Sequence, residues 1–185
     1  DEVREIVREV KRLVEENVRR NDDVARKSRK LVKENKDRNK EVVDRLRELV
    51  KRALDEVRRI KEEEELRRVV KEIRDELRRL RKKLKDINDD SERKSRELNK
   101  LVKDINKKSE EELEKLRDRV RRLRVPEKLL KEVEDMIRTV KKELKDSARR
   151  VSEEDKRSKE DLKRSAKEVE ETIKDVLRKL DTETT

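Results

Sequence analysis

The sequence contains no cysteine, histidine, glycine or aromatic residue, and it has a single proline. Without cysteine there can be no disulfide and no thiolate to attack a substrate or bind a metal. Without histidine the commonest general base and the commonest transition-metal ligand are missing. Without glycine a phosphate-binding loop of the nucleotide-binding type cannot form. We therefore expect neither enzymatic activity nor a cofactor.

Long hydrophobic runs are also missing. No apolar stretch approaches the roughly 18 residues that a membrane-spanning helix requires, so we expect no membrane association. The N-terminal residues Asp1-Glu2 are acidic and do not resemble the start of a signal peptide. With no targeting signal in the sequence, the location of the protein is left open.

What the chain has in abundance is charge. Charged residues make up 60% of the chain and hydrophobic residues 29%, a balance that is typical of disordered chains. However, 61 basic and 50 acidic residues are finely interleaved, and the commonest residues are strong helix formers. The net charge of +11 would attract phosphate backbones at low salt. Without aromatic side chains to stack on bases, we expect no specific binding of nucleic acid.

Apolar residues recur at steps of three and four in three long stretches, which is the spacing of one face of an amphipathic helix. The three stripes begin at Val3, Val7 and Val10, at Leu66, Val70 and Ile73, and at Leu130, Val133 and Ile137. This pattern predicts an all-α fold with helices over about 2–61, 65–123 and 127–180.

The two breaks between the stripes differ in clarity. Pro126 marks the second break, because proline is favoured at the start of a helix and not inside one. The first break, at Glu62–Glu65, has no glycine, proline, asparagine or aspartate. There the apolar stripe changes face between Ile60 and Leu66, which favours a tight turn. The alternative is a continuous helix in a swapped oligomer.

Three long helices of matched length, joined by short turns, are expected to pack as antiparallel neighbours. We predict a single-chain, long, antiparallel three-helix bundle with coiled-coil-like packing, in which residues 1–185 form one domain. The apolar residues suffice for one such core and leave few for a second interface. A monomer that requires no partner is therefore the simplest expectation, and self-association or a designed partner helix is the alternative.

Polar residues interrupt the apolar stripes in the central part of each helix. The polar core predicted from these interruptions consists of Asn17, Asn21, Ser28, Asn35, Asn39, Asn88, Ser91, Ser95, Asn99, Asn106, Ser109, Ser147, Ser152, Asp155, Ser158 and Ser165. Asp155 and Asp161 are also the only candidates for a carboxylate metal site. A bundle metal site needs several inward acids with histidine partners, so we expect no metal.

An antiparallel register with turns near 63 and 125 brings these residues together at five levels. The predicted levels are Asn17 with Ser109, Asn21 with Asn106 and Ser147, Ser28 with Asn99 and Ser152, Asn35 with Ser91 and Ser158, and Asn39 with Asn88 and Ser165. A buried amide or hydroxyl without a partner costs a few kcal/mol. Our hypothesis is that these groups bond to one another and penalise wrong registers. The alternative is that they lie at the edge of the stripe and bond to water.

The central part of the bundle has few large apolar groups, so we expect it to open more readily than the ends. A further motif, Arg149-Arg150-Val151-Ser152, resembles the recognition sequence of a basic-directed protein kinase. We expect Ser152 to face inward, where a phosphate would disrupt the helix packing.

The Glu/Lys/Arg/Asp surface, the Val/Leu/Ile stripes and the matched Asn and Ser clusters resemble de novo designed helical bundles with buried hydrogen-bond networks. The resemblance covers essentially the whole chain and is one of style, not of a motif. It implies a structural scaffold without catalysis. It equally allows an assembly or binding module, either an oligomer component or a switch whose third helix is displaced. Spectrin-like repeats differ in carrying core aromatic residues.

Overall fold

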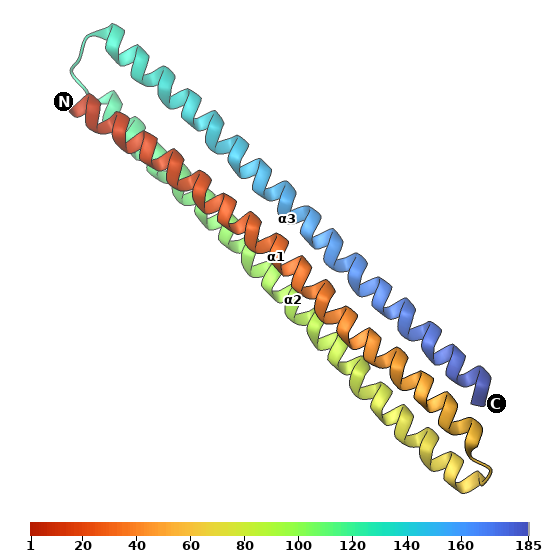
Figure 1. The fold of residues 1–185 in the computed structure, drawn as a ribbon. Helices are drawn as coiled ribbons and strands as arrows, with labels where there is room; N and C mark the ends of the chain where they lie inside the picture. The colour runs from red at the N-terminus through yellow and green to blue at the C-terminus, as the bar shows by residue number, and fades with distance from the viewer. Residues whose placement is uncertain (185) are drawn as a thin grey trace. The chain divides into compact units, whose positions relative to one another are not determined.

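A computed structural model describes residues 1–184. Three long helices account for nearly all of them: α1 (Glu2–Arg59), α2 (Glu63–Arg121) and α3 (Glu127–Thr184). Within the described residues there is no strand. The three helices pack together as a bundle, so the predicted all-α three-helix fold is confirmed (Figure 1).

The contacts of the chain divide into two compact units. Unit 1 consists of Asp1–Arg29 and Ser95–Ser158, and unit 2 consists of Lys30–Lys94 together with the residues from Lys159 onward. Each unit contains a segment of all three helices. In each of them the segment of α2 runs antiparallel to those of α1 and α3.

The core of unit 1 is formed where the apolar stripes of the three helices meet. Its main cluster of buried residues contains Ile6, Val10, Leu13, Leu113, Leu116, Val120, Val133, Ile137, Val140 and Leu144. A second, smaller cluster contains Val24, Val102, Ile105 and Val151. The second cluster buries fewer and smaller side chains, so it contributes less hydrophobic stabilisation than the first.

The core of unit 2 is likewise apolar. One cluster contains Leu46, Val50, Ala53, Ile73, Leu77, Val176 and Leu180, and a second contains Val42, Val43, Leu84, Ile87, Val169 and Ile173. On the outside, charged residues form pairs one turn apart, such as Arg52 with Glu48 at 2.8 Å and Arg67 with Glu63 at 3.1 Å. Exposed pairs of this kind support the helix by only a few tenths of a kcal/mol each.

The connection between α1 and α2 is a tight turn in unit 2. Only residues 60–62 lie outside the helices, and no described residue of the chain has a positive φ. The helix ends therefore lack the left-handed glycine cap that many helices use. Instead, Arg58 and Arg59 stand at the negative end of the α1 dipole, and Glu63–Glu65 stand at the positive end of the α2 dipole.

The connection between α2 and α3 is longer and lies in unit 1. Pro126 precedes α3, and its carbonyl oxygen accepts hydrogen bonds from the backbone N–H groups of Leu129 and Leu130. The residue before a proline is disfavoured in the helical conformation, and the chain bends at Val125 before α3 begins. Figure 1 shows this loop as an extended arm that leads to the start of α3. Its length shifts the register of α3 relative to α1 in unit 1.

Within residues 1–184, none of the helices has a stretch sufficiently long and apolar to cross a membrane.

Candidate functional site

The first buried polar layer lies in unit 1 and involves all three helices. We call Asn17, Asn21, Asn106, Ser109 and Ser147 polar layer 1. The amide nitrogen of Asn17 donates to Ser109 Oγ at 2.6 Å and to Asn106 Oδ1 at 3.3 Å. The amide nitrogen of Asn21 donates to Asn17 Oδ1 at 3.1 Å, to Asn106 Oδ1 at 3.0 Å and to Ser147 Oγ at 3.0 Å. Asn17 and Asn21 are each only 2% exposed.

Backbone carbonyl groups of α2 set the direction of these hydrogen bonds. Asn106 donates its amide to the carbonyl oxygen of Val102 at 3.0 Å, and Ser109 donates its hydroxyl to that of Ile105 at 3.0 Å. Because both donors are used on the backbone, Asn106 Oδ1 and Ser109 Oγ face α1 as acceptors. The amide orientations of Asn17 and Asn21 follow from this, since a flipped amide would bring two oxygens together.

The second buried polar layer lies in unit 2. We call Asn35, Asn39, Asn88, Ser91 and Ser165 polar layer 2. Its bonds correspond one for one to those of polar layer 1: Asn35 to Ser91 at 2.7 Å and to Asn88 at 3.1 Å, and Asn39 to Asn35 at 3.1 Å, to Asn88 at 2.9 Å and to Ser165 at 3.1 Å. Asn88 and Ser91 again donate to backbone carbonyls one turn earlier. The two layers therefore have the same bonding scheme.

The correspondence between the two layers is visible in the sequence as a repeat, which the level-by-level prediction did not consider. Each residue of polar layer 2 is 18 positions from its counterpart in polar layer 1 on the same helix, as with Asn17 and Asn35 or Ser147 and Ser165. Eighteen residues make five helical turns of about 3.6 residues. On α2 the repeat is visible directly, as Lys-Asp-Ile-Asn-x-x-Ser at 85–91 and again at 103–109.

A third group of polar residues lies in unit 1, outside polar layer 1. Ser28 donates its hydroxyl to Ser158, and Asn99 donates its amide to Asp155 Oδ2 at 2.6 Å. Arg29 and Glu154 form an ion pair between α1 and α3 at 3.2 Å at its border. Ser95 is also buried, and its hydroxyl oxygen has no hydrogen-bond partner among the described residues.

Most of the sixteen residues expected in the polar core are enclosed. Twelve are buried, and Asn88, Asn99 and Asn106 are half-buried with hydrogen bonds to buried partners.

Ser152 is the exception. It is exposed, so the prediction that it faces inward with Ser28 is wrong. Val151, the preceding residue, occupies the inward position, and one residue further turns the helix by about 100°.

The partners of Ser28 and Ser158 also differ from the prediction. Ser28 bonds to Ser158, which lies 130 positions along the chain, and Ser158 had been expected at the level of Asn35. The α1–α3 pairs in the two polar layers are separated by 126 positions. The partners on α3 thus lie further along the chain than a hairpin centred on residue 125 would give, by less than one turn in the polar layers and by more than one turn at Ser158. In unit 1 the extended loop before Pro126 accounts for this shift.

One polar atom in each layer stays unsatisfied. Asn21 Oδ1 and Asn39 Oδ1 are buried without a hydrogen-bond partner in the described residues. In each case the amide nitrogen of the same side chain faces three acceptors with only two hydrogens. In each layer the amide oxygen of the second asparagine on α1, Asn21 or Asn39, is therefore the one buried polar side-chain atom left without a hydrogen bond among the described residues.

The described residues contain no group of three or more His, Cys, Asp or Glu side chains arranged to hold a metal ion. Asp155 accepts its hydrogen bond from Asn99, and Asp161 lies 3.8 Å from Arg164 in a surface ion pair. The polar layers consist of amides and hydroxyls bonded to one another. The chemistry that this arrangement supports is mutual recognition between helices.

The geometry defines the class to which the chain belongs, the three-helix bundles. Among solved structures it is similar to one described as a "Computationally designed three helix bundle", with a TM-score of 0.54 and 16% sequence identity over 99% of this chain and 89% of that chain. At this identity the likeness shows the fold alone. No protein-family model and no curated protein matches the sequence.

Proposed function

We propose that the chain is a designed structural scaffold without a native biochemical activity, in which the two polar layers specify the register of the helices. The observation that carries the proposal is the bonding scheme of each layer. In polar layer 1, three hydrogen bonds join α1 to α2 and a fourth joins α1 to α3. A helix displaced along its axis would bury these amides against leucine or valine, at a cost of a few kcal/mol for each unpaired group.

The composition supports the same proposal. A chain with 60% charged residues and no aromatic residue, glycine, cysteine or histidine combines helix-forming surfaces with a purely aliphatic core. Five residues on three helices recur after 18 positions on each helix, as expected if one bonding scheme was designed once and used twice. The proposal also retains the expectation that residues 1–185 form one domain and act as a monomer.

The test measures register directly. The chain has no cysteine, so two cysteine residues introduced by mutation are the only thiols that a cross-linker can join. Arg38→Cys with Asp90→Cys, joined by a short flexible bismaleimide, reports the native register, because the Arg38 guanidinium and the Asp90 carboxylate form an ion pair across α1 and α2 at 3.5 Å. Arg38→Cys with Lys83→Cys reports a register displaced by seven residues. The cross-linking yields of the two pairs give the populations of the two registers.

Both reporters are placed in the parent chain and in a variant whose ten layer residues are replaced by Leu (Asn sites) and Val (Ser sites). The parent should form only the native pair. The variant should form the displaced pair as well, even if it melts at a higher temperature. Variants with only one layer replaced serve as matched controls and should keep the native register, because the remaining layer still penalises displacement. Exclusive formation of the native pair without either layer would refute the proposal.

A second candidate function rests on how unevenly the layers hold the helices. In polar layer 2, α1 and α2 share three hydrogen bonds, whereas α3 is held by the single bond from Asn39 to Ser165. A module whose third helix is displaced by a competing helix would have this asymmetry. Sedimentation equilibrium with and without a synthetic peptide of residues 127–185 tests it. A complex with the peptide, or a mass that rises with concentration, supports the module; a constant single-chain mass supports the scaffold.

A further inference from the structure

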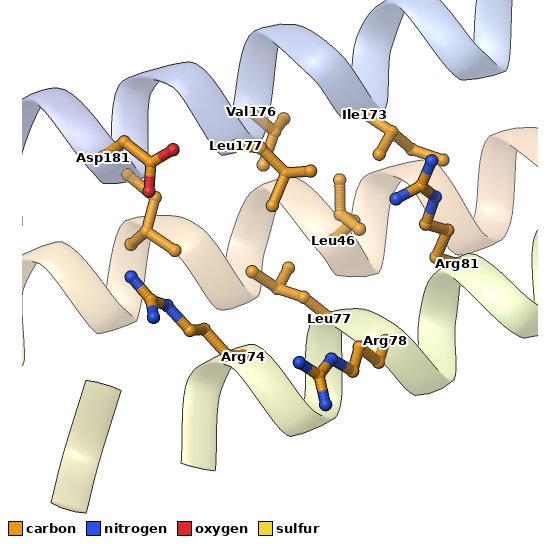
Figure 2. Close-up of a pocket in the computed structure, with 10 residues that line it drawn as sticks. Leu46, Arg74, Leu77, Arg78, Arg81, Ile173, Val176, Leu177 and Asp181 are labelled. Atoms are coloured by element: carbon orange, nitrogen blue, oxygen red, sulfur yellow. The ribbon is translucent and has the colours of Figure 1, made fainter. Parts of the chain in front are cut away.

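Unit 2 contains an open pocket between α2 and α3 whose floor is apolar (Figure 2). Its volume is about 200 Å³. The pocket is lined by Leu46, Leu77, Ile173, Val176, Leu177 and Leu180, by Arg74, Arg78 and Arg81, and by Asp181. An apolar cavity of about 150 Å³ is large enough to hold a benzene ring, so this pocket has room for a short hydrocarbon segment.

The polar rim of the pocket is predominantly cationic. Arg74, Arg78 and Arg81 are spaced four and three residues apart, so all three lie along one edge of α2. They are exposed, and none of them forms an ion pair with another residue of the described chain. Figure 2 shows Arg74 and Arg81 reaching from α2 toward the side of the pocket formed by α3. Asp181 is the single acidic residue of the lining, which leaves an excess of two positive charges.

The sequence around the rim raises the positive potential further. Residues 78–85 read Arg-Arg-Leu-Arg-Lys-Lys-Leu-Lys, and no acidic residue lies between Glu76 and Asp86. The other stretches of comparable length without an acidic residue, 24–33 and 119–126, contain five and four cations, whereas this run contains six. A local excess of one sign beside an apolar surface attracts ligands of opposite charge and raises their association rate.

A pocket of similar size in unit 1 provides an internal comparison. It also lies between α2 and α3 and has a volume of about 180 Å³. Its lining contains only two apolar residues, Leu113 and Ile137, and its four cations are accompanied by Glu114 and Glu134. Arg117 and Glu114 are 3.7 Å apart as an ion pair. The pocket of unit 1 therefore lacks the apolar floor of the pocket in unit 2, and acidic side chains in its own lining balance a larger share of its cations.

We propose that the pocket of unit 2 binds a free medium-chain alkyl carboxylate. The alkyl chain would lie on Leu77, Val176 and Leu177, where it removes apolar surface from water. The carboxylate would lie at the rim, because a guanidinium group donates two parallel hydrogen bonds to a carboxylate. The small volume favours such a ligand over an amphipathic helix, which would need a longer groove. The apolar floor favours it over an inorganic anion.

The test uses octanoate, well below its micelle concentration, and the intact chain. Calorimetry gives the affinity, and methyl NMR of Ile173 and Leu177, compared with Ile137 and Leu113, gives the location. Arg74→Glu with Arg78→Glu should weaken binding by about tenfold or more. The matched control, Arg117→Glu with Arg121→Glu, changes the net charge by the same amount on the same helix and should bind octanoate as the parent does. Arg81→Gln, a milder second variant that replaces one good helix former by another, should also weaken the binding of octanoate.

Octanol, with the same chain and no charge, should bind at least about tenfold more weakly than octanoate. The proposal is overturned if octanol binds as tightly, if the Arg74/Arg78 variant keeps the parent affinity, or if the methyl shifts fall on Ile137. It is also overturned if the chain binds phosphatidylserine vesicles while free octanoate leaves Leu177 unshifted, since the basic segment would then recognise a membrane surface.

Discussion

The side-chain amide of Asn39 donates a hydrogen bond to the amide oxygen of Asn35, one turn earlier on α1, at 3.1 Å. The same amide nitrogen lies 2.9 Å from Asn88 Oδ1 and 3.1 Å from Ser165 Oγ. One nitrogen thus contacts acceptors on all three helices of unit 2. Its loss would leave Asn35 Oδ1 buried without a donor, whereas the loss of Ser165 would remove a single acceptor.

We therefore predict that Asn39→Leu destabilises the chain by about 1–3 kcal/mol, which is the cost of leaving a buried acceptor without a hydrogen-bond donor. Ser165→Ala should cost less, about 1 kcal/mol or below. Because polar layer 1 has the same bonding scheme, Asn21→Leu should match Asn39→Leu and Ser147→Ala should match Ser165→Ala. Urea unfolding followed by circular dichroism measures these differences. Equal or greater stability of Asn39→Leu would mean that water satisfies the layer in place of the amide.

Asp90 gives a prediction about pH. It lies 2.7 Å from Arg93, 3.3 Å from Lys94 and 3.5 Å from Arg38. The hydrogen bond from Arg93, followed by that from Lys94, holds the pKa of Asp90 below its ordinary value. A lowered pKa means that the ionised form is favoured in the folded state. Its stabilising contribution is full above the ordinary pKa and is lost as the pH falls through the lowered pKa.

Carbon-detected NMR titration of the Asp90 carboxyl should show this lowered pKa, and in Arg93→Gln it should rise toward the ordinary value. Asp90→Asn should reduce the loss of stability on acidification without changing the unfolding midpoint greatly at neutral pH, since the pair is exposed to solvent. A pKa that stays the same in Arg93→Gln would assign the shift to another group.

Hydrogen exchange should distinguish the two apolar clusters of unit 1. The cluster around Val10 and Val120 has ten buried residues, and the cluster around Val24 and Val102 has four. Because local opening is easier where less apolar surface is buried, the amides of Val24 and Val102 should exchange faster than those of Val10 and Val120. The opposite order would show that the polar groups nearby stabilise the helices more than the larger aliphatic cluster does.

Thermal unfolding tests whether residues 1–185 behave as one domain. Each helix contributes a segment to both units, so we predict a single cooperative transition in which the calorimetric and van't Hoff enthalpies agree. Val10→Ala, which creates a cavity in unit 1, should then lower the midpoint for probes in both units by the same amount. Two separate transitions, with only one of them displaced, would mean two independent domains.

Much of the fold follows from the apolar spacing. The stripe that changes face between Ile60 and Leu66 predicts a turn without any turn residue, and the structure has residues 60–62 outside the helices there. The register between α1 and α2 also follows from simple hairpin arithmetic, because a three-residue turn leaves little freedom. Asn17 and Asn35 accordingly bond to Ser109 and Ser91.

The register of α3 follows only in part from the same arithmetic, since Ser147 and Ser165 bond to Asn21 and Asn39 at the expected levels but Ser158 does not bond at its expected level. It depends on how far the extended segment before Pro126 carries the chain, and no spacing rule gives that distance. Ser158 bonds to Ser28 and not to Asn35 for this reason, whereas Ser152 is exposed because the inward position belongs to the preceding Val151. The direction of the hydrogen bonds was equally out of reach, because it depends on side-chain rotamers and on the carbonyl groups of Val102 and Leu84.

The repeat of 18 residues can be continued beyond polar layer 2, toward the turn between α1 and α2. One further step of five turns from polar layer 2 leads to Ala53 and Val57 on α1 and to Val70 and Ile73 on α2. Ala53 and Ile73 are buried in an aliphatic cluster with Val57 packed against it. The same rotational phase thus hosts amides at one height and methyl groups at another. Positions separated by five helical turns on one helix therefore accept either polar or apolar side chains, and the choice of side chain alone sets the height at which a polar layer forms.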